Sequence, residues 1–98
     1  MSKLRDAARG RECQVRIPGV CNGNTETTVL AHYRMLPDCG TAIKPIDLIG
    51  AWACSDCHRL VDGASTASWT REQLDLMHLE GMVRTIVALN KRGMLKCT

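Results

Sequence analysis

The chain has 98 residues, a formal net charge of +3, no phenylalanine, and only two tryptophans and one tyrosine. A chain of this length predicts one small domain, residues 1–98, whose core is built from aliphatic, methionine and alanine side chains. Such thin cores are often reinforced by disulfides or by a metal. The modest basic excess fits a nucleic-acid partner but does not require one, because scattered charge usually only solvates a surface.

The first residues, MSKLRDAARGREC, are charged and contain no apolar central stretch. They predict neither a signal peptide nor a membrane segment, so we expect a protein of the reducing cytoplasm. In that compartment paired cysteines bind metals more often than they form disulfides. The same expectation argues against covalent haem at the sequence CSDCH, since a c-type haem is attached after export.

Residues 3 to 9 predict a short helix. The stretch CQVRIPGVC that follows predicts two short extended pieces around a turn at Pro18 and Gly19. This turn would bring Cys13 and Cys21 towards each other.

The stretch TVLAHYR, residues 28 to 34, has the β-branched and apolar content of a strand, with His32 near its end. Prolines and glycines interrupt residues 35 to 50, which predicts a long loop before a short strand at AWA. Loops of this length in small domains are usually functional or mobile.

A short helix is predicted after Cys54, ending at Gly63, and a longer one from about residue 70 to 92. Thr70 and Gln73 have the spacing of a capping box at the start of the longer helix. Its apolar residues recur at helical spacing and predict the face packed on the core: Leu76, Leu79, Val83, Ile86 and Val87. His78 lies just off this stripe, which predicts a surface or boundary histidine.

Two cysteine pairs predict a structural Zn²⁺ site. Cys54 and Cys57 have the spacing of a zinc half-site at a helix start, and Cys13 and Cys21 can supply the other half. The alternatives are a redox pair, which lacks its βαβ context, and buried cysteines that act as small hydrophobic residues. Two cysteines are left over: Cys39, which could replace Cys13 or Cys21, and Cys97.

The order of a strand histidine, a loop and a CxxCH helix resembles the His-Me finger (HNH, ββα-metal) nucleases on a treble-clef zinc scaffold. The stretches LRDAARGRECQVRIPGVCNGN, VLAHYR, KPIDLIGAWACSDCH and GMVRT are similar to the YbcO-type nuclease family of lambdoid prophages over most of the chain. The resemblance implies an α+β fold with a zinc-stapled treble-clef core and an added C-terminal helix.

Carried over onto matching positions, the resemblance makes His32 the general base and His58 a ligand of a catalytic Mg²⁺ or Mn²⁺ ion. Asp62, four residues after His58, is a candidate second ligand because the two share a helical face. Two positions depart from the pattern. Ala31 stands where many HNH nucleases have a metal ligand, and only Asp47 is a candidate for the asparagine that orients the base.

The resemblance implies a metal-dependent endonuclease that hydrolyses DNA phosphodiester bonds. Three basic residues flank the two histidines and are candidate phosphate contacts: Arg34, Lys44 and Arg59. The alternative is a zinc module without catalysis that binds nucleic acid or a phage protein, because a fold does not by itself establish an activity. The sequence leaves open whether two copies form a homodimer to cut both strands.

Overall fold

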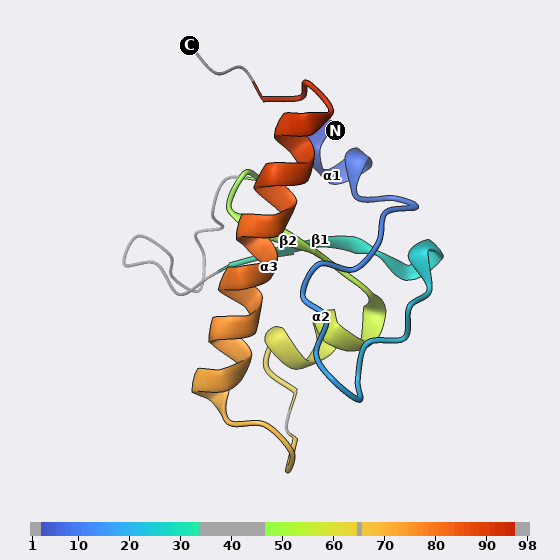
Figure 1. Ribbon diagram of the computed structural model, residues 1–98. Helices are drawn as coiled ribbons and strands as arrows, with labels where there is room; N and C mark the ends of the chain where they lie inside the picture. Colours follow the sequence, from blue (N-terminus) through green and yellow to red (C-terminus); the bar gives the residue numbers. More distant parts are fainter. Residues whose placement is uncertain (1–2, 34–46, 65, 96–98) are drawn as a thin grey trace.

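The computed structural model describes residues 3–33, 47–64 and 66–95. Their elements are, in chain order, α1 (Lys3–Ala7), η1 (Thr25–Thr27), β1 (Val29–His32), β2 (Gly50–Ala53), α2 (Ser55–Val61) and α3 (Arg71–Lys91), as drawn in Figure 1. The fold is therefore α+β, as predicted. None of the helices in these residues is long and apolar enough to cross a membrane.

The two strands form an antiparallel pair in which Val29 faces Ala53 and His32 faces Gly50. All four residues of β2 are buried, since β1 covers one side of the strand and α3 packs across it (Figure 1). The side chain of Thr85 on α3 accepts a hydrogen bond of 2.9 Å from the Trp52 backbone N–H. The hydroxyl gives the buried N–H an acceptor that would otherwise have to come from a third strand.

The segment between Cys13 and Cys21 contains the predicted turn but not the predicted extended pieces. The backbone N–H of Val20 donates to the Ile17 carbonyl at 3.0 Å, which closes the turn. No strand is assigned to this segment, whose only backbone hydrogen bond to β2 runs from Gln14 N–H to the Trp52 carbonyl at 2.7 Å. A ladder cannot form because the Thr85 hydroxyl occupies the next donor on that edge.

Helix α3 begins at the capping box that the sequence predicted. The Thr70 hydroxyl accepts from Gln73 N–H at 3.1 Å, and the Gln73 side chain accepts from Thr70 N–H at 2.9 Å. Both bonds satisfy donors of the first turn that have no partner within the helix.

The predicted core face of α3 is wrong. Leu76 is 58% exposed and Val83 is 54% exposed, whereas the helix buries a different set: Leu74, His78, Gly81, Thr85 and Leu89. The reason is that α3 lies very close to the N-terminal segment at this point: a Cβ atom on Gly81 would lie 3.0 Å from the Cα atom of Val15. Small residues in the middle of the buried face let the helix lie against the N-terminal segment and β2, while Leu74 and Leu89 are buried towards its two ends.

His78 is also placed differently from the prediction, since it is 4% exposed rather than on the surface. Its Nε2 lies 2.8 Å from the Ala31 carbonyl oxygen, and its ring packs edge-on against Tyr33 at 5.2 Å between centroids. A carbonyl can only accept, so Nε2 carries the proton and donates. The histidine thereby ties α3 to β1.

Candidate metal centre and histidine site

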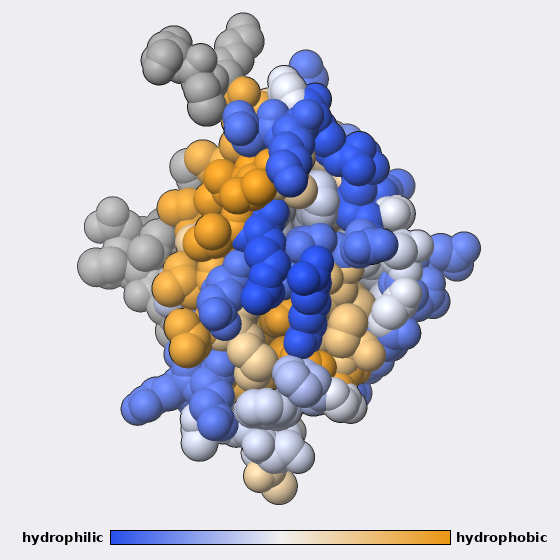
Figure 2. Space-filling view, viewed as in Figure 1, coloured by the Kyte–Doolittle hydropathy of each residue, from blue (hydrophilic) through white to orange (hydrophobic). Residues whose placement is uncertain are grey.

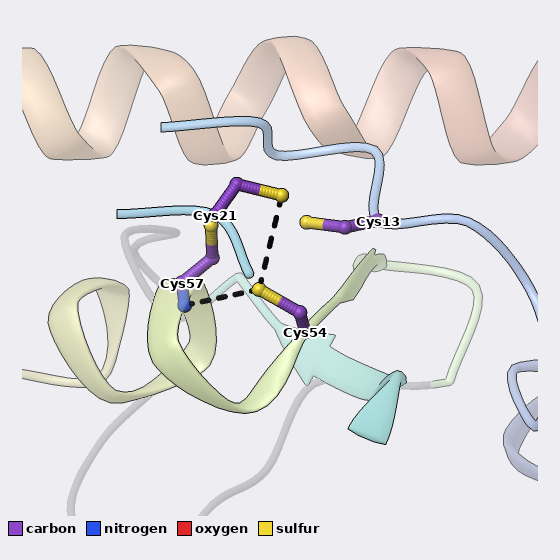
Figure 3. Close-up of side chains that lie close together, drawn as sticks. All are labelled: Cys13, Cys21, Cys54 and Cys57. Atoms are coloured by element: carbon purple, nitrogen blue, oxygen red, sulfur yellow. Dashed lines mark hydrogen bonds between the residues drawn. The ribbon is translucent and has the colours of Figure 1, made fainter. Parts of the chain in front are cut away.

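Four cysteines from two distant segments meet beside the sheet. Cys13 and Cys21 come from the N-terminal loop, while Cys54 precedes α2 and Cys57 lies in its first turn (Figure 3). Their sulfur atoms all lie within 4.8 Å of one another, and Cys54 Sγ is 3.9 Å from Cys21 Sγ. Cys21 is exposed and the other three are buried.

The spacing of these sulfurs fits a metal ion. Tetrahedral Zn²⁺ with Zn–S bonds of about 2.3 Å requires sulfurs about 3.8 Å apart. A disulfide would need two sulfurs at about 2.05 Å, and all four cysteines are free. Within residues 3–33, 47–64 and 66–95, no other group of three or more His, Cys, Asp or Glu side chains brings its ligand atoms this close.

Backbone N–H groups point at two of the four sulfurs. Arg16 N–H donates to Cys13 Sγ, and Cys57 N–H donates to Cys54 Sγ, both at 3.5 Å. Arg16 has a left-handed backbone with φ of 56°, which is strained for a residue other than glycine.

Hydrogen bonding and burial shift the pKa values of these thiols in different directions. The side-chain hydrogen bond between Cys13 and Cys57 lowers the pKa of Cys13 to about 4 and raises the pKa of Cys57. Burial raises the pKa of Cys21. A coordinated metal deprotonates such thiols, so the donor set has the chemistry of a four-cysteine zinc site.

A second cluster lies at the end of β1, where His32 meets Asp47. His32 Nε2 is 2.8 Å from Asp47 Oδ1, and both side chains are largely buried, at 13% and 17% exposure. A carboxylate only accepts, so Nε2 carries a proton and donates; in the neutral tautomer with this bond, Nδ1 holds the lone pair. Residues 47–49 return to the sheet beside β1, where Tyr33 N–H donates to the Ile49 carbonyl at 3.0 Å.

Arg5 on α1 completes this cluster, and the sequence reasoning missed it. Its Nε lies 3.3 Å from both carboxylate oxygens of Asp47, and its side chain is 63% exposed. The two residues are 42 positions apart, and one arginine among many on a basic chain carries no signal of such a pair. The cluster therefore joins a histidine, a carboxylate and an exposed guanidinium.

His58, predicted to bind a catalytic ion, is half-buried on α2, and α2 contacts β1. Burial and, to a smaller extent, His58 lower the pKa of His78, whose Nε2 donates to the carbonyl of the residue before His32. Asp62 caps α2 with its backbone N–H bonded to the His58 carbonyl, and its side chain is exposed. His58 and Asp62 have no third potential ligand beside them in the part of the chain described, so a metal-binding cluster does not form there.

The predicted phosphate contacts are described only in part. Arg59 is exposed on α2 and pairs with Asp56 at 3.6 Å. Arg34 and Lys44 lie outside the described residues, as do the leftover Cys39 and Cys97 and most of the loop predicted for residues 35 to 50.

Comparison with known proteins identifies relatives along nearly the whole chain. The family model described as "Putative nuclease YbcO" matches residues 2–94. "Putative nuclease YbcO" of Escherichia coli (strain K12) and "Putative nuclease ybcO" of Enterobacteria phage 82 are each 54% identical over 99 residues, covering 98% of this chain and 99% of the relative.

A solved structure agrees in fold as well. It is described as "Structure of a putative bacteriophage protein from Escherichia coli str. K-12 substr. MG1655", is 50% identical, and matches with a TM-score of 0.77 over 93% of this chain and all of that chain. The family model, the two relatives and this structure lead to one conclusion: the chain belongs to the YbcO family, which includes a phage protein and bears the description of a nuclease.

Proposed function

We propose that this chain is a DNA endonuclease of the His-Me finger type, with His32 as general base and a structural Zn²⁺ on Cys13, Cys21, Cys54 and Cys57. The observation that carries the proposal is the 2.8 Å hydrogen bond between His32 and Asp47. It supports a base whose ring is held in one tautomer by a carboxylate, an arrangement that recurs in hydrolytic enzymes. The relatives' description as nucleases points the same way.

In this mechanism His32 takes a proton through Nδ1 from a water molecule. The water oxygen attacks the phosphorus of a phosphodiester, a new P–O bond forms, and the bond to the 3′ oxygen breaks. The departing oxygen takes a proton from solvent. Asp47 holds the ring and stabilises the imidazolium that forms when His32 is protonated, as a carboxylate partner does for other catalytic histidines.

His58, with Asp62 as a second candidate, is the proposed binding position for Mg²⁺ or Mn²⁺, which would stabilise negative charge on the phosphate. These ions prefer oxygen ligands, and the described residues place no cluster of ligands around His58. The proposed proton transfer therefore uses only His32 and Asp47. The nicking assay with added Mg²⁺ or Mn²⁺ tests the metal requirement.

Two exposed basic side chains, Arg5 and Arg59, are proposed phosphate contacts, together with Arg34 and Lys44. Arg5 is the best supported, because its pair with Asp47 holds the guanidinium beside His32. Guanidinium groups bind phosphate oxygens in two-pronged geometry. An arginine at this position would hold the backbone of the substrate next to the base.

The test is a plasmid-nicking assay with added Mg²⁺ or Mn²⁺ on the wild type and three variants, each checked for zinc content. We expect His32→Ala to lower cleavage about 10²–10⁴-fold, the usual contribution of a positioned base. Asp47→Ala should cause a similar loss, because the ring then has no partner that holds its tautomer. His58→Ala should recover part of its activity at high Mg²⁺ or Mn²⁺, whereas His32→Ala should not.

Equal cleavage by the wild type and His32→Ala would contradict the proposal. So would the absence of cleavage by the zinc-loaded wild type on supercoiled, linear, single-stranded and branched DNA with either ion. Either result would favour the alternative function, a zinc module that binds nucleic acid or a phage protein without cutting.

A further inference from the structure

Positive and negative charges are separated along this chain. Residues 3–11 and 81–95 hold seven basic residues and one acidic residue, a formal charge of +6. Residues 12–80 hold five basic and nine acidic residues, a formal charge of −4. The small net charge of the whole chain, +3, therefore hides two strongly basic segments. Such asymmetry is typical of proteins that bind polyanions.

The fold brings the two basic segments together at one end of the molecule. The side chains of Leu4, Ala7 and Ala8 pack in one apolar cluster with Ala88 and Leu89, so α1 lies beside the C-terminal end of α3 (Figure 1). Figure 2 shows hydrophilic side chains gathered over this end, at the upper right of the molecule. Charges from two distant parts of the sequence thus add on one surface.

Five of the seven basic side chains on these segments are available to a ligand. Arg84 donates to the Gln14 carbonyl at 2.6 Å and Arg11 donates to the Ala7 carbonyl at 3.0 Å, so both serve the fold. The other five are exposed and form what we call the basic end: Lys3, Arg5, Arg9, Lys91 and Arg92. Apart from Arg5, none of these five has an ion-pair partner among the residues that the structure describes.

The basic end borders the candidate histidine site. Arg5 belongs to both, because its Nε lies 3.3 Å from the carboxylate of Asp47, which bonds in turn to His32. A polyanion that lies along α1 therefore passes close to His32.

We propose that the basic end holds the phosphate backbone of duplex DNA and that this backbone continues past Arg5 to His32. The inference rests on the proposed function, which supplies DNA as the substrate, and it names the surface that holds this substrate. Each exposed cation that meets a phosphate releases counterions, so the contact adds affinity without reading the base sequence.

The side chains at this end favour a duplex over single strands and over a membrane. Sites for single strands stack bases on exposed aromatic rings. Of the three aromatic residues in the chain, Trp52 is 3% exposed, Trp69 lies before the opposite end of α3, and Tyr33 packs against His78. A membrane-surface helix needs a broad exposed apolar face, whereas α1 has only five residues and its apolar side chains pack on α3.

The first test measures binding to a fluorescent duplex of random sequence over a range of salt concentrations, without added Mg²⁺ or Mn²⁺. We expect the logarithm of the binding constant to fall against the logarithm of the salt concentration with a slope of about −3 to −5. The double variant Arg9→Gln/Arg92→Gln should lower the size of this slope by about 2 and weaken binding at low salt about tenfold or more.

The matched control for this variant is Arg16→Gln/Arg71→Gln. It removes the same charge from two exposed arginines outside the basic end. We expect this control to keep the slope of the wild type. Zinc content and circular dichroism confirm that each protein is folded.

The second test removes an acidic residue and looks for a gain. Asp6 is the one acidic residue in the two basic segments, and it is exposed on α1. Asp6→Asn should tighten duplex binding about twofold to threefold, because it removes repulsion of the phosphates. Glu72→Gln removes the same charge in the first turn of α3 and should not. A gain in affinity cannot come from misfolded protein.

Three results would overturn the proposal. The first is an Arg9→Gln/Arg92→Gln variant that keeps the affinity and the slope of the wild type. The second is a control variant that loses as much as this variant does. The third is displacement of the labelled duplex by single strands, or by vesicles of phosphatidylserine, as effective as displacement by unlabelled duplex at equal phosphate concentration. All of these measurements are made without cleavage, so a failure of His32 as general base would leave them unchanged.

Discussion

At the residue scale, two histidines on neighbouring elements have opposite surroundings. His32 lies at the end of β1 and bonds to the carboxylate of Asp47. The exposed side chain of Arg5 pairs with the same carboxylate. His78 is buried against a backbone carbonyl and an aromatic ring. The first arrangement fixes the ring of His32 with a carboxylate, whereas the second favours the neutral ring of His78 and suits a structural tie.

We expect His78 to make the protein sensitive to acid. Burial lowers its pKa below 6.5, with His58 and Arg71 adding to the effect and the Ala31 carbonyl and Asp75 opposing it. Below pH 6.5 the unfolded chain therefore binds more protons than the folded one, so the free energy of unfolding falls as the pH drops, by at most about 1.4 kcal/mol per pH unit. The fall should level off below the pKa of the folded state.

Urea unfolding between pH 7.5 and 5 checks this expectation. His78→Gln is the control, because an amide N–H can still donate to the Ala31 carbonyl but does not titrate. The cysteine cluster contributes its own pH dependence equally to both proteins. Parallel curves for the wild type and the variant would show that His78 is not the group responsible.

At the element scale, the middle of α3 packs on the core through a glycine, while Leu76, Leu79, Val83 and Val87 stay exposed. Replacing a mid-helix glycine by alanine normally stabilises a helix by about 1 kcal/mol. We expect Gly81→Ala to destabilise the protein by about 1–3 kcal/mol instead, because the new Cβ would lie 3.0 Å from the Val15 Cα and 3.1 Å from the Gln14 carbonyl oxygen. Chemical denaturation measures the change in the free energy of unfolding. A gain in stability would contradict this expectation, because it would mean that the helix can move away from the new Cβ.

At the scale of the whole molecule, the cysteine cluster joins the N-terminal loop to α2. We expect one Zn²⁺ per chain, and we expect Cys54→Ser to unfold the protein, because structural zinc contributes about 10–16 kcal/mol and small domains have only about 5–15 kcal/mol of stability. Elemental analysis and circular dichroism measure both effects. Cys97→Ser, outside the predicted ligand set, should keep its zinc and its fold. A folded, zinc-free wild type prepared without chelators would contradict the expectation.

Local signals in the sequence were sufficient for several features. The capping box at Thr70 and the turn at Pro18 were predicted because both depend on residues a few positions apart. The grouping of four cysteines was predicted from two short spacings, and their sulfurs do lie together. The quoted stretches also indicated the family, which the comparisons confirm. The roles assigned to the histidines remain predictions.

The sequence by itself determined the helices, the short strands, the cysteine cluster and the family, because each is encoded by neighbouring residues or by matching stretches. Only the tertiary structure decided which face of α3 is buried and that Arg5 joins Asp47 beside His32. Periodicity reveals that a helix has an apolar side, but not whether that side meets the core. Here the close packing of α3 decided which face is buried. Gly81 and Thr85 allow an approach that leucine or valine at these two positions would prevent.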